Sequence, residues 1–333
     1  MLLYFRYSLK ALSTVLQSRK YLSFRNSIPA GACENDTRNY LKGNRRKQYL
    51  SALFLYGNAW AVLRKKKLTG TEKKRLALLS IAAPLFDDLY DACHLYPDLI
   101  ESLVMDPVGT ETDPDDSLLW CFRNVLICLY KTLNPPQETF RQLIMQLMRA
   151  QEKSRNLLWP ASDADIISVT EEKGGLAAVL IRSILDDPLT LEEQRVAFSL
   201  GFLAQLMDDL FDLTSDQVDG RATSACLFRN ADEARRFFLE KEKEWHALCQ
   251  ELPFAAERKQ HFVQYIHLLL SPVFVCLDRY ENFTNKTGIN LFDRTFQNPV
   301  LICDMEKWSS RFRLLVLASR NSRFIRDHAS EVE

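Results

Sequence analysis

An apolar stretch in the middle of the chain carries aspartates at helical spacing, and this pattern constrains the fold more than any other feature. The stretch at residues 201–223 reads GFLAQLMDDLFDLTSDQVDGRAT and holds Asp208, Asp209 and Asp212, with Asp216 one turn later. Residues four apart share one face of a helix. Carboxylates on one face of an apolar helix repel each other and are costly to desolvate. The fold must therefore place this face against a cation or against water.

A second aspartate cluster with the same spacing lies far upstream, where residues 86–91 read FDDLYD. Mg²⁺ takes carboxylate oxygens together with substrate phosphates, so it would relieve the repulsion in both clusters. We therefore expect the two helices to face each other and to bind several Mg²⁺ ions with the substrate. The expected catalytic carboxylates are Asp87, Asp88, Asp208 and Asp209, and the expected metal ligands are Asp87, Asp88, Asp91, Asp208, Asp212 and Asp216.

Residues that interrupt helices are scarce in this chain. The 333 residues include only 10 Gly and 12 Pro, which favours long helices. No segment shows strand alternation, and no stretch rich in Gly, Ser or Pro suggests a linker. We expect an all-α, single-domain bundle over residues 41–333, preceded by a basic helix and loop at 1–40. The longest expected helices cover 44–67, 138–158, 163–185, 191–216, 232–250 and 257–282, and a last one covers 305–319. The helix at 44–67 has an apolar side that includes Trp60 and Leu63, and the alternating Glu and Lys of the helix at 232–250 indicate an exposed, charged helix. Asp115 and Asp116 are expected to cap the helix that starts at Ser117, and Asp186-Asp187 is expected to lie in a loop.

Composition and charge exclude several other classes of protein. The chain has 43 basic and 43 acidic residues, so its net charge gives no reason to expect a nucleic-acid partner. The eight cysteines form no CxxC pair, which argues against both a zinc site and a disulfide framework. The five histidines lack metal-ligand spacing, and neither a nucleophile motif nor a glycine-rich phosphate loop is present.

The N-terminal segment is basic and open to three interpretations. Its first 33 residues contain no Asp or Glu. A basic helix packed on the body of the protein is the favoured interpretation; a helix that touches a membrane surface and, in a eukaryote, an organellar transit peptide are the alternatives. No apolar run is long enough to span a bilayer, since the nearest, 267–277, is short and contains Pro272. We expect a cytoplasmic protein, with peripheral membrane contact left open, and a homodimer is compatible with the sequence.

The two aspartate segments resemble those of the class I isoprenoid synthases, which comprise trans-prenyltransferases and class I terpene synthases. The first cluster matches the DDxxD motif of trans-prenyltransferases. The second matches GxxFQxxDDxxD from Gly201 and Gln205 onward, with Ala204 in place of the Phe. The GKxT that often follows in the family is matched by Gly220, Arg221 and Thr223, with Arg replacing Lys. The resemblance covers roughly residues 76–223.

This resemblance implies a fold, a substrate and a set of contacts. The family has an all-α fold in which two aspartate-rich helices face each other across a central apolar cavity. Its members use Mg²⁺ to ionise an allylic prenyl diphosphate. By resemblance, Lys173 matches a diphosphate-binding Lys, and Arg279-Tyr280 resembles an Arg-Tyr pair of terpene synthases; a helix-end Arg beside a half-buried Tyr is the alternative. The expected diphosphate contacts are therefore Lys173, Gln205, Arg221, Arg279 and Tyr280.

Departures from the family pattern favour one branch. Prenyltransferases have an Arg pair soon after the first DDxxD, but the residues after Asp91 here read ACHLYPDLI and contain no Arg. The binding site for isopentenyl diphosphate is therefore in doubt, and terpene synthase activity is the preferred expectation. A trans-prenyltransferase that makes a longer polyprenyl diphosphate is the first alternative. A non-catalytic helical protein that binds lipid or a partner subunit is the second.

Overall fold

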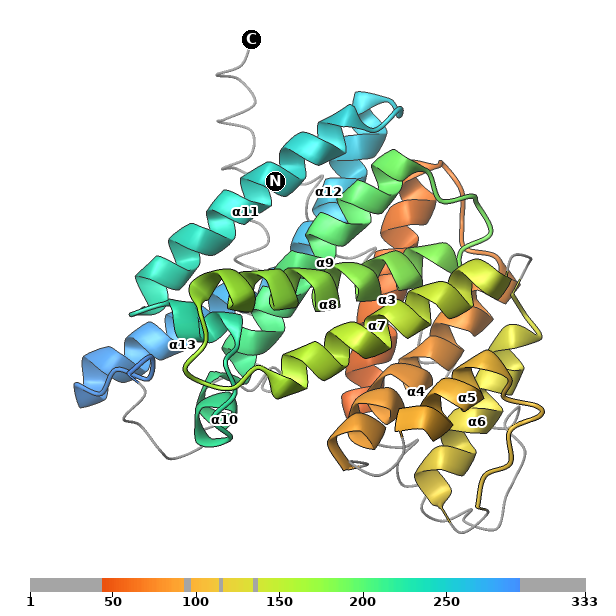
Figure 1. Cartoon of the computed structure of the whole chain (residues 1–333). Helices are drawn as coiled ribbons and strands as arrows, with labels where there is room; N and C mark the ends of the chain where they lie inside the picture. The colour runs from red at the N-terminus through yellow and green to blue at the C-terminus, as the bar shows by residue number, and fades with distance from the viewer. Residues whose placement is uncertain (1–43, 93–96, 114–115, 134–136, 294–333) are drawn as a thin grey trace. The chain divides into compact units, whose positions relative to one another are not determined.

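The computed structural model describes residues 44–293 except 93–96, 114–115 and 134–136. Within these ranges every regular element is a helix, and the only strand-like pairing is an isolated bridge between Leu158 and Arg221 (Figure 1). The predicted all-α fold is confirmed. The predicted N-terminal helix and loop at 1–40 and the helix at 305–319 lie outside the described residues, so the interpretations of the N-terminal segment stay predictions.

The described chain divides into two compact units. The first unit contains described residues 44–146 and Leu180–Pro188, and the second contains Leu147–Val179 and 189–293. The chain passes from one unit to the other within α7 (Gln137–Asn156) and again within α8 (Asp163–Ser183). Both helices were expected from the sequence, over 138–158 and 163–185. Each ends two residues before its expected end, at Asn156 and at Ser183.

The first unit is built around α4, which packs against α3 and α6, while α5 packs against α6. The predicted apolar side of α3 is buried, as Trp60 and Leu63 show with no exposed surface. Asp116 caps α6, because the backbone N–H groups of Leu118 and Leu119 donate to its Oδ1 at 3.2 and 3.0 Å. The bounds are α3 (Asn44–Leu63), α4 (Gly70–Ala92), α5 (Pro97–Met105) and α6 (Ser117–Tyr130).

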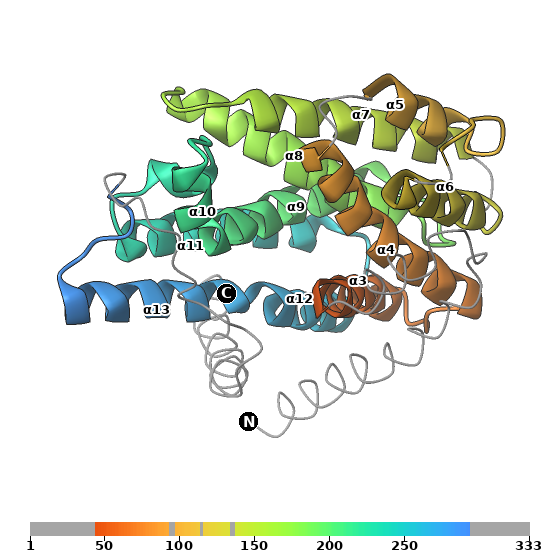
Figure 2. The same cartoon turned by 90° about the horizontal axis from the view of Figure 1, so that it is seen from below.

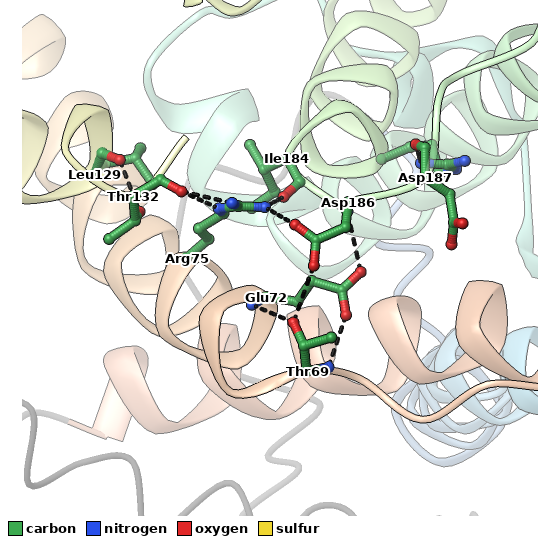
Figure 3. Close-up of polar contacts among 9 residues, drawn as sticks. Thr69, Glu72, Arg75, Leu129, Thr132, Ile184, Asp186 and Asp187 are labelled. Atoms are coloured by element: carbon green, nitrogen blue, oxygen red, sulfur yellow. Dashed lines mark hydrogen bonds and ion pairs between the residues drawn. The ribbon is translucent and has the colours of Figure 1, made fainter. Parts of the chain in front are cut away.

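A buried polar network fixes the start of α4 (Figure 3). The guanidinium of Arg75, 2% exposed, donates to the carbonyls of Thr132 and Ile184 and forms an ion pair of 2.6 Å with Asp186. Thr69 caps the helix: the N–H of Glu72 donates to its Oγ1 at 3.1 Å, while its own N–H donates to the Glu72 carboxylate at 2.7 Å. A buried charge is tolerated here because it is paired and its donors are bonded.

The second unit is built around α9, which packs against α11, α12 and α13. Helices α12 and α13 follow one another nearly in line (Figure 2). The sequence predicted one kinked helix over 257–282, but the chain forms two helices that meet at Ser271, because Pro272 starts the second one. The bounds are α9 (Leu191–Phe211), α10 (Leu213–Val218), η2 (Ser224–Leu227), α11 (Ala231–Glu251), α12 (Ala256–Leu270) and α13 (Pro272–Thr287).

The helix predicted over 191–216 is also interrupted. Asp212 lies between α9 and α10 with φ −95° and ψ 4°. Near this point the hydroxyl of Tyr280 donates to the carbonyl of Leu210 at 2.5 Å, and the thiol of Cys276 donates to the same oxygen at 3.7 Å. Side chains that bond into the backbone ladder open a helix locally. The sequence could not reveal this break, since its cause lies on α13.

One described segment, Ala256–Thr287, is long and apolar enough to cross a membrane by length and composition. It comprises α12 and α13, and 61% of its most apolar window is buried inside the protein. The core helices of soluble proteins pass the same test of length and composition. The burial of the window therefore fits two core helices of the second unit.

Candidate functional site

Three predicted metal ligands lie along one edge of α9 and α10. The break at Asp212 keeps the helical path, because the N–H of Asp212 donates to Asp208 O at 3.0 Å and the N–H of Asp216 donates to Asp212 O at 2.9 Å. Each carboxylate therefore follows the previous one by a turn. Asp208 and Asp212 are exposed, and Asp216 is half-buried. The second unit thus presents a row of acids at the end of its central helix.

Negative charge is crowded at the inner end of this row. Burial, together with the charges of Asp209 and Asp212, raises the pKa of Asp216 to about 7, whereas Arg221 and Thr223 act in the opposite direction. A carboxylate in such a place is stabilised by a cation or by a proton. The row is therefore suited chemically to bind a cation.

Asp209 is used differently from its neighbours. Its side chain is buried, and its Oδ2 accepts hydrogen bonds from Ser224 N at 2.9 Å and Ser224 Oγ at 2.5 Å. Its Oδ1 accepts a hydrogen bond from Gln205 Nε2 at 2.8 Å, and the same nitrogen lies 3.4 Å from Asp208 Oδ2. Asp209 and Gln205 are thus bonded to each other within the fold.

Arg221 lies beside the row because its loop is held by backbone contacts. The N–H of Arg221 donates to Asp216 O at 2.9 Å, and the N–H of Ala222 donates to Leu157 O at 3.0 Å. The Arg221 guanidinium is 3.7 Å from the exposed carboxylate of Asp219. The structure therefore brings a predicted diphosphate contact to the inner end of the acidic row.

Helices α8 and α9 cross one another (Figure 1), and a glycine of each helix lies at the contact. A Cβ added to Gly174 would lie 2.3 Å from Gly201 O, and one added to Gly201 would lie 2.0 Å from Gly174 O. Helices α8 and α9 therefore touch backbone to backbone, which only glycine permits. The added Cβ of Gly174 would also lie 2.7 Å from the Cβ of Gln205. Lys173 precedes this contact, so its position on α8 adjoins the α9 motif.

The Arg279-Tyr280 pair lies on α13 of the same unit. Tyr280 is 3% exposed and its hydroxyl proton is donated to Leu210 O, as described above. To donate to a diphosphate, the hydroxyl would have to give up this bond. Arg279 is half-buried next to it. A diphosphate contact by this pair stays a prediction.

The first acidic segment lies in the first unit, in the last turns of α4. Asp87 and Asp88 are half-buried, and the hydroxyl of Tyr49 donates to Asp87 Oδ2 at 3.1 Å. The flanking rings of Phe86 and Tyr90 are buried with centroids 4.8 Å apart. The side chain of Asp91 lies outside the described residues. That this segment faces the α9 segment across an apolar cavity stays a prediction.

The acidic row consists of carboxylates of the kind that Mg²⁺ takes together with substrate phosphates. Among the described residues, no group of three or more His, Cys, Asp or Glu side chains is arranged to hold a metal ion. Mg²⁺ is commonly bound by one or two carboxylates, with substrate phosphates and water completing its shell. Exposed carboxylates such as Asp208 and Asp212 meet that requirement.

A buried cluster in the second unit was missed by the sequence analysis. Nε2 of His246 on α11 lies 2.8 Å from Nε2 of His267 on α12, and Nδ1 of His267 lies 3.1 Å from Glu242 Oε1, outside hydrogen-bond geometry. Burial raises the pKa of Glu242 to about 7 and lowers the pKa of His246 to about 4 and of His267 to about 3.

The prediction that α11 is an exposed, charged helix was therefore wrong for one of its faces. Phe238, Glu242, Trp245 and Cys249 are buried at spacings of three and four residues. That spacing was the available signal, and the many Glu and Lys residues around it concealed it.

Comparisons with known proteins found similarity among solved structures. The sequence matches no known family profile and no curated protein. Among solved structures, the chain is similar to a dehydrosqualene synthase whose crystal structure was determined in complex with a ligand. The two chains are 16% identical, the similarity covers 86% of this chain and 98% of the other, and the TM-score is 0.43.

Proposed function

We propose that this protein ionises an allylic prenyl diphosphate with the help of Mg²⁺ and releases a terpene. The observation that carries the proposal is the acidic row at Asp208, Asp212 and Asp216 with Arg221 beside its inner end. Asp208 and Asp212 stand at positions where this sequence resembles the second motif of the class I isoprenoid synthases, and Asp216 follows one turn later. The row pairs acids that can take a divalent cation with a base that can meet a phosphate.

Residues of the second unit would have separate roles in binding and ionising the diphosphate. Asp208 and Asp212 would hold the metal-bound diphosphate at the exposed part of the row. Arg221 and Lys173 would add fixed positive charge on the oxygens of the leaving group. Magnesium bound with the substrate would stabilise the charge that develops there as the C–O bond breaks. The buried side chains of Leu206 and Leu210 would help keep water from the allylic cation.

Prenyl transfer is the second candidate for the same site. Here a second isoprenoid would trap the cation and lengthen the chain. The absence of Arg among residues 92–100 favours the terpene outcome, because prenyl transfer needs a site for a second diphosphate. A non-catalytic role as a lipid-binding or partner subunit is the alternative if neither reaction takes place.

The test is an incubation of the purified protein with prenyl diphosphates of increasing length. Each is incubated with Mg²⁺ or EDTA, with and without isopentenyl diphosphate, and products are identified by mass spectrometry. We expect Mg²⁺-dependent release of diphosphate and a hydrocarbon or alcohol product without isopentenyl diphosphate. Consumption of isopentenyl diphosphate would establish prenyl transfer instead. If no prenyl diphosphate is turned over under any condition, the enzymatic proposal is wrong.

A further inference from the structure

The second aspartate of the α9 motif is set apart from its neighbours by its surroundings. Asp208 and Asp212 are exposed, whereas Asp209 is 6% exposed. Its carboxylate already accepts three hydrogen bonds from Ser224 and Gln205. A carboxylate has about four lone-pair sites, so little capacity remains for a cation. The contacts of Asp209 therefore indicate that this side chain stabilises the neighbouring loop at 219–224.

That loop depends on Asp209 at one of its ends. Ser224 begins η2, and both its N–H and its hydroxyl are bonded to Asp209. Three residues earlier, the N–H of Arg221 is bonded to Asp216 O. The segment at 219–224 is therefore fastened to the end of α9 through the Asp209 side chain at Ser224, and to α10 through the backbone at Arg221.

We propose that Asp209 is a positioning residue, which through Ser224 holds the loop at 219–224 and so presents Arg221 to the substrate diphosphate. The identity of the diphosphate rests on the proposed function; the attachment of the loop rests on the contacts alone. In this role Asp209 needs hydrogen-bond acceptors and not a negative charge.

This requirement separates positioning from metal binding. In Asp209→Asn, the carbonyl can accept both bonds from Ser224, and the amide can donate to Gln205 once the Gln205 amide turns over. Asp209→Ala removes the acceptor of both bonds from Ser224, whereas Ser224→Ala removes the hydroxyl donor and keeps the backbone N–H. At a metal ligand, in contrast, both substitutions would remove the negative charge, so both would raise the Mg²⁺ concentration for half-activation. Asp208→Asn is the matched control, because it makes the same change at the exposed neighbour.

The first measurement is hydrogen–deuterium exchange of the full chain without Mg²⁺ or substrate. Asp209→Ala and Ser224→Ala should speed exchange in the segment at 219–227 by about tenfold or more. The segment should exchange as in the wild type in Asp208→Asn, and nearly so in Asp209→Asn. Exchange at the wild-type rate in both Asp209→Ala and Ser224→Ala would overturn the proposal. If Asp209→Ala does not fold, Ser224→Ala and Asp209→Asn still decide it.

The second measurement is the steady-state kinetics of the same variants. Ser224→Ala should raise KM for the prenyl diphosphate by about tenfold while the Mg²⁺ concentration for half-activation stays near the wild-type value. Asp208→Asn should instead raise that Mg²⁺ concentration. An Asp209→Asn variant that loses as much activity as Asp208→Asn, with its loop still protected, would also overturn the proposal. A wild type without turnover would refute the proposed function alone, since exchange still tests the attachment.

Discussion

The two acidic segments share a sequence pattern but differ in local structure. On α4, Asp87 and Asp88 lie within an uninterrupted helix, and the described contact of Asp87 is the hydroxyl of Tyr49. On α9, the pattern straddles a helix break, and Asp209 is bonded to a loop that carries a base. The difference teaches that a DDxxD pattern does not give its aspartates equal roles. The surroundings of each carboxylate decide which of them is available to a cation.

The largest expected effect tests whether the two segments act together. Asp87→Ala and Asp208→Ala should each lower diphosphate release by roughly a thousandfold, equivalent to about 4 kcal/mol of transition-state stabilisation. The reason is that both carboxylates are expected to share one metal-bound diphosphate. Release of diphosphate from a prenyl diphosphate is the readout. Full activity in Asp87→Ala beside an inactive Asp208→Ala would show that only the second segment takes part.

The next largest expected effect tests whether the second acidic segment depends on the close contact between α8 and α9. Gly201→Ala should destabilise the protein by about 3 kcal/mol, because its methyl group would overlap the backbone of Gly174. Urea unfolding measures the change. Gly70→Ala is the control, since a Cβ at Gly70 meets nothing within 4 Å and Ala favours a helix. Equal stabilities of the two variants would contradict the close crossing.

A smaller effect concerns the crowded charge at Asp216. Its pKa is raised from 3.8 to about 7 in the folded state, so between these values the folded chain binds more protons than the unfolded chain. The stability contributed by this group is present at low pH and is lost as the pH rises through 7. Asp216→Asn should therefore stabilise the protein at pH 8 by on the order of 2 kcal/mol and have little effect at pH 4.

The measurement for Asp216 is denaturant unfolding in EDTA at the two pH values. Asp219→Asn, on an exposed neighbour, is the control for the loss of one carboxylate from this segment. An equal gain in the free energy of unfolding at both pH values would show that the pKa of Asp216 is not raised by its surroundings. The same variant should lose activity, since the acid that destabilises the fold is the one proposed to meet the cation.

The smallest expected effect concerns the first acidic segment, on α4. Tyr49→Phe removes the hydroxyl that donates to Asp87 and should cost about 1 kcal/mol, the usual value for one partly buried hydrogen bond. Urea unfolding and diphosphate release would both be measured. A large loss of activity with little loss of stability would show that Tyr49 orients Asp87 for its chemistry, which would make the two segments more alike.

The local elements of the fold could be predicted from the sequence, because their causes are local. The scarcity of Gly and Pro predicted helices throughout, the apolar spacing predicted the buried side of α3, and Asp116 was predicted to cap α6. The aspartates at 186 and 187 were predicted to lie in a loop, and Asp186 does bond the start of α4.

The rest depends on partners that are distant in sequence. The break at Asp212 involves Tyr280, and the burial of Asp209 involves Ser224. Hydropathy and spacing on one helix carry no information about either contact. The site was therefore predicted as a set of equivalent acids, whereas the structure gives them unequal surroundings. The two-histidine cluster was missed for the same reason, since His246 and His267 lie on different helices.

The buried chain of Glu242, His267 and His246 has a consequence for the way the second unit forms. In an unfolded chain the two imidazoles take up protons below about pH 6.5, whereas burial between α11 and α12 favours their neutral forms. Closing the two helices on each other is therefore coupled to the loss of protons from the imidazoles below about pH 6.5. In stopped-flow experiments, the docking of α12 on α11 should become slower in mildly acidic buffer, and replacing both histidines by Phe should abolish that dependence.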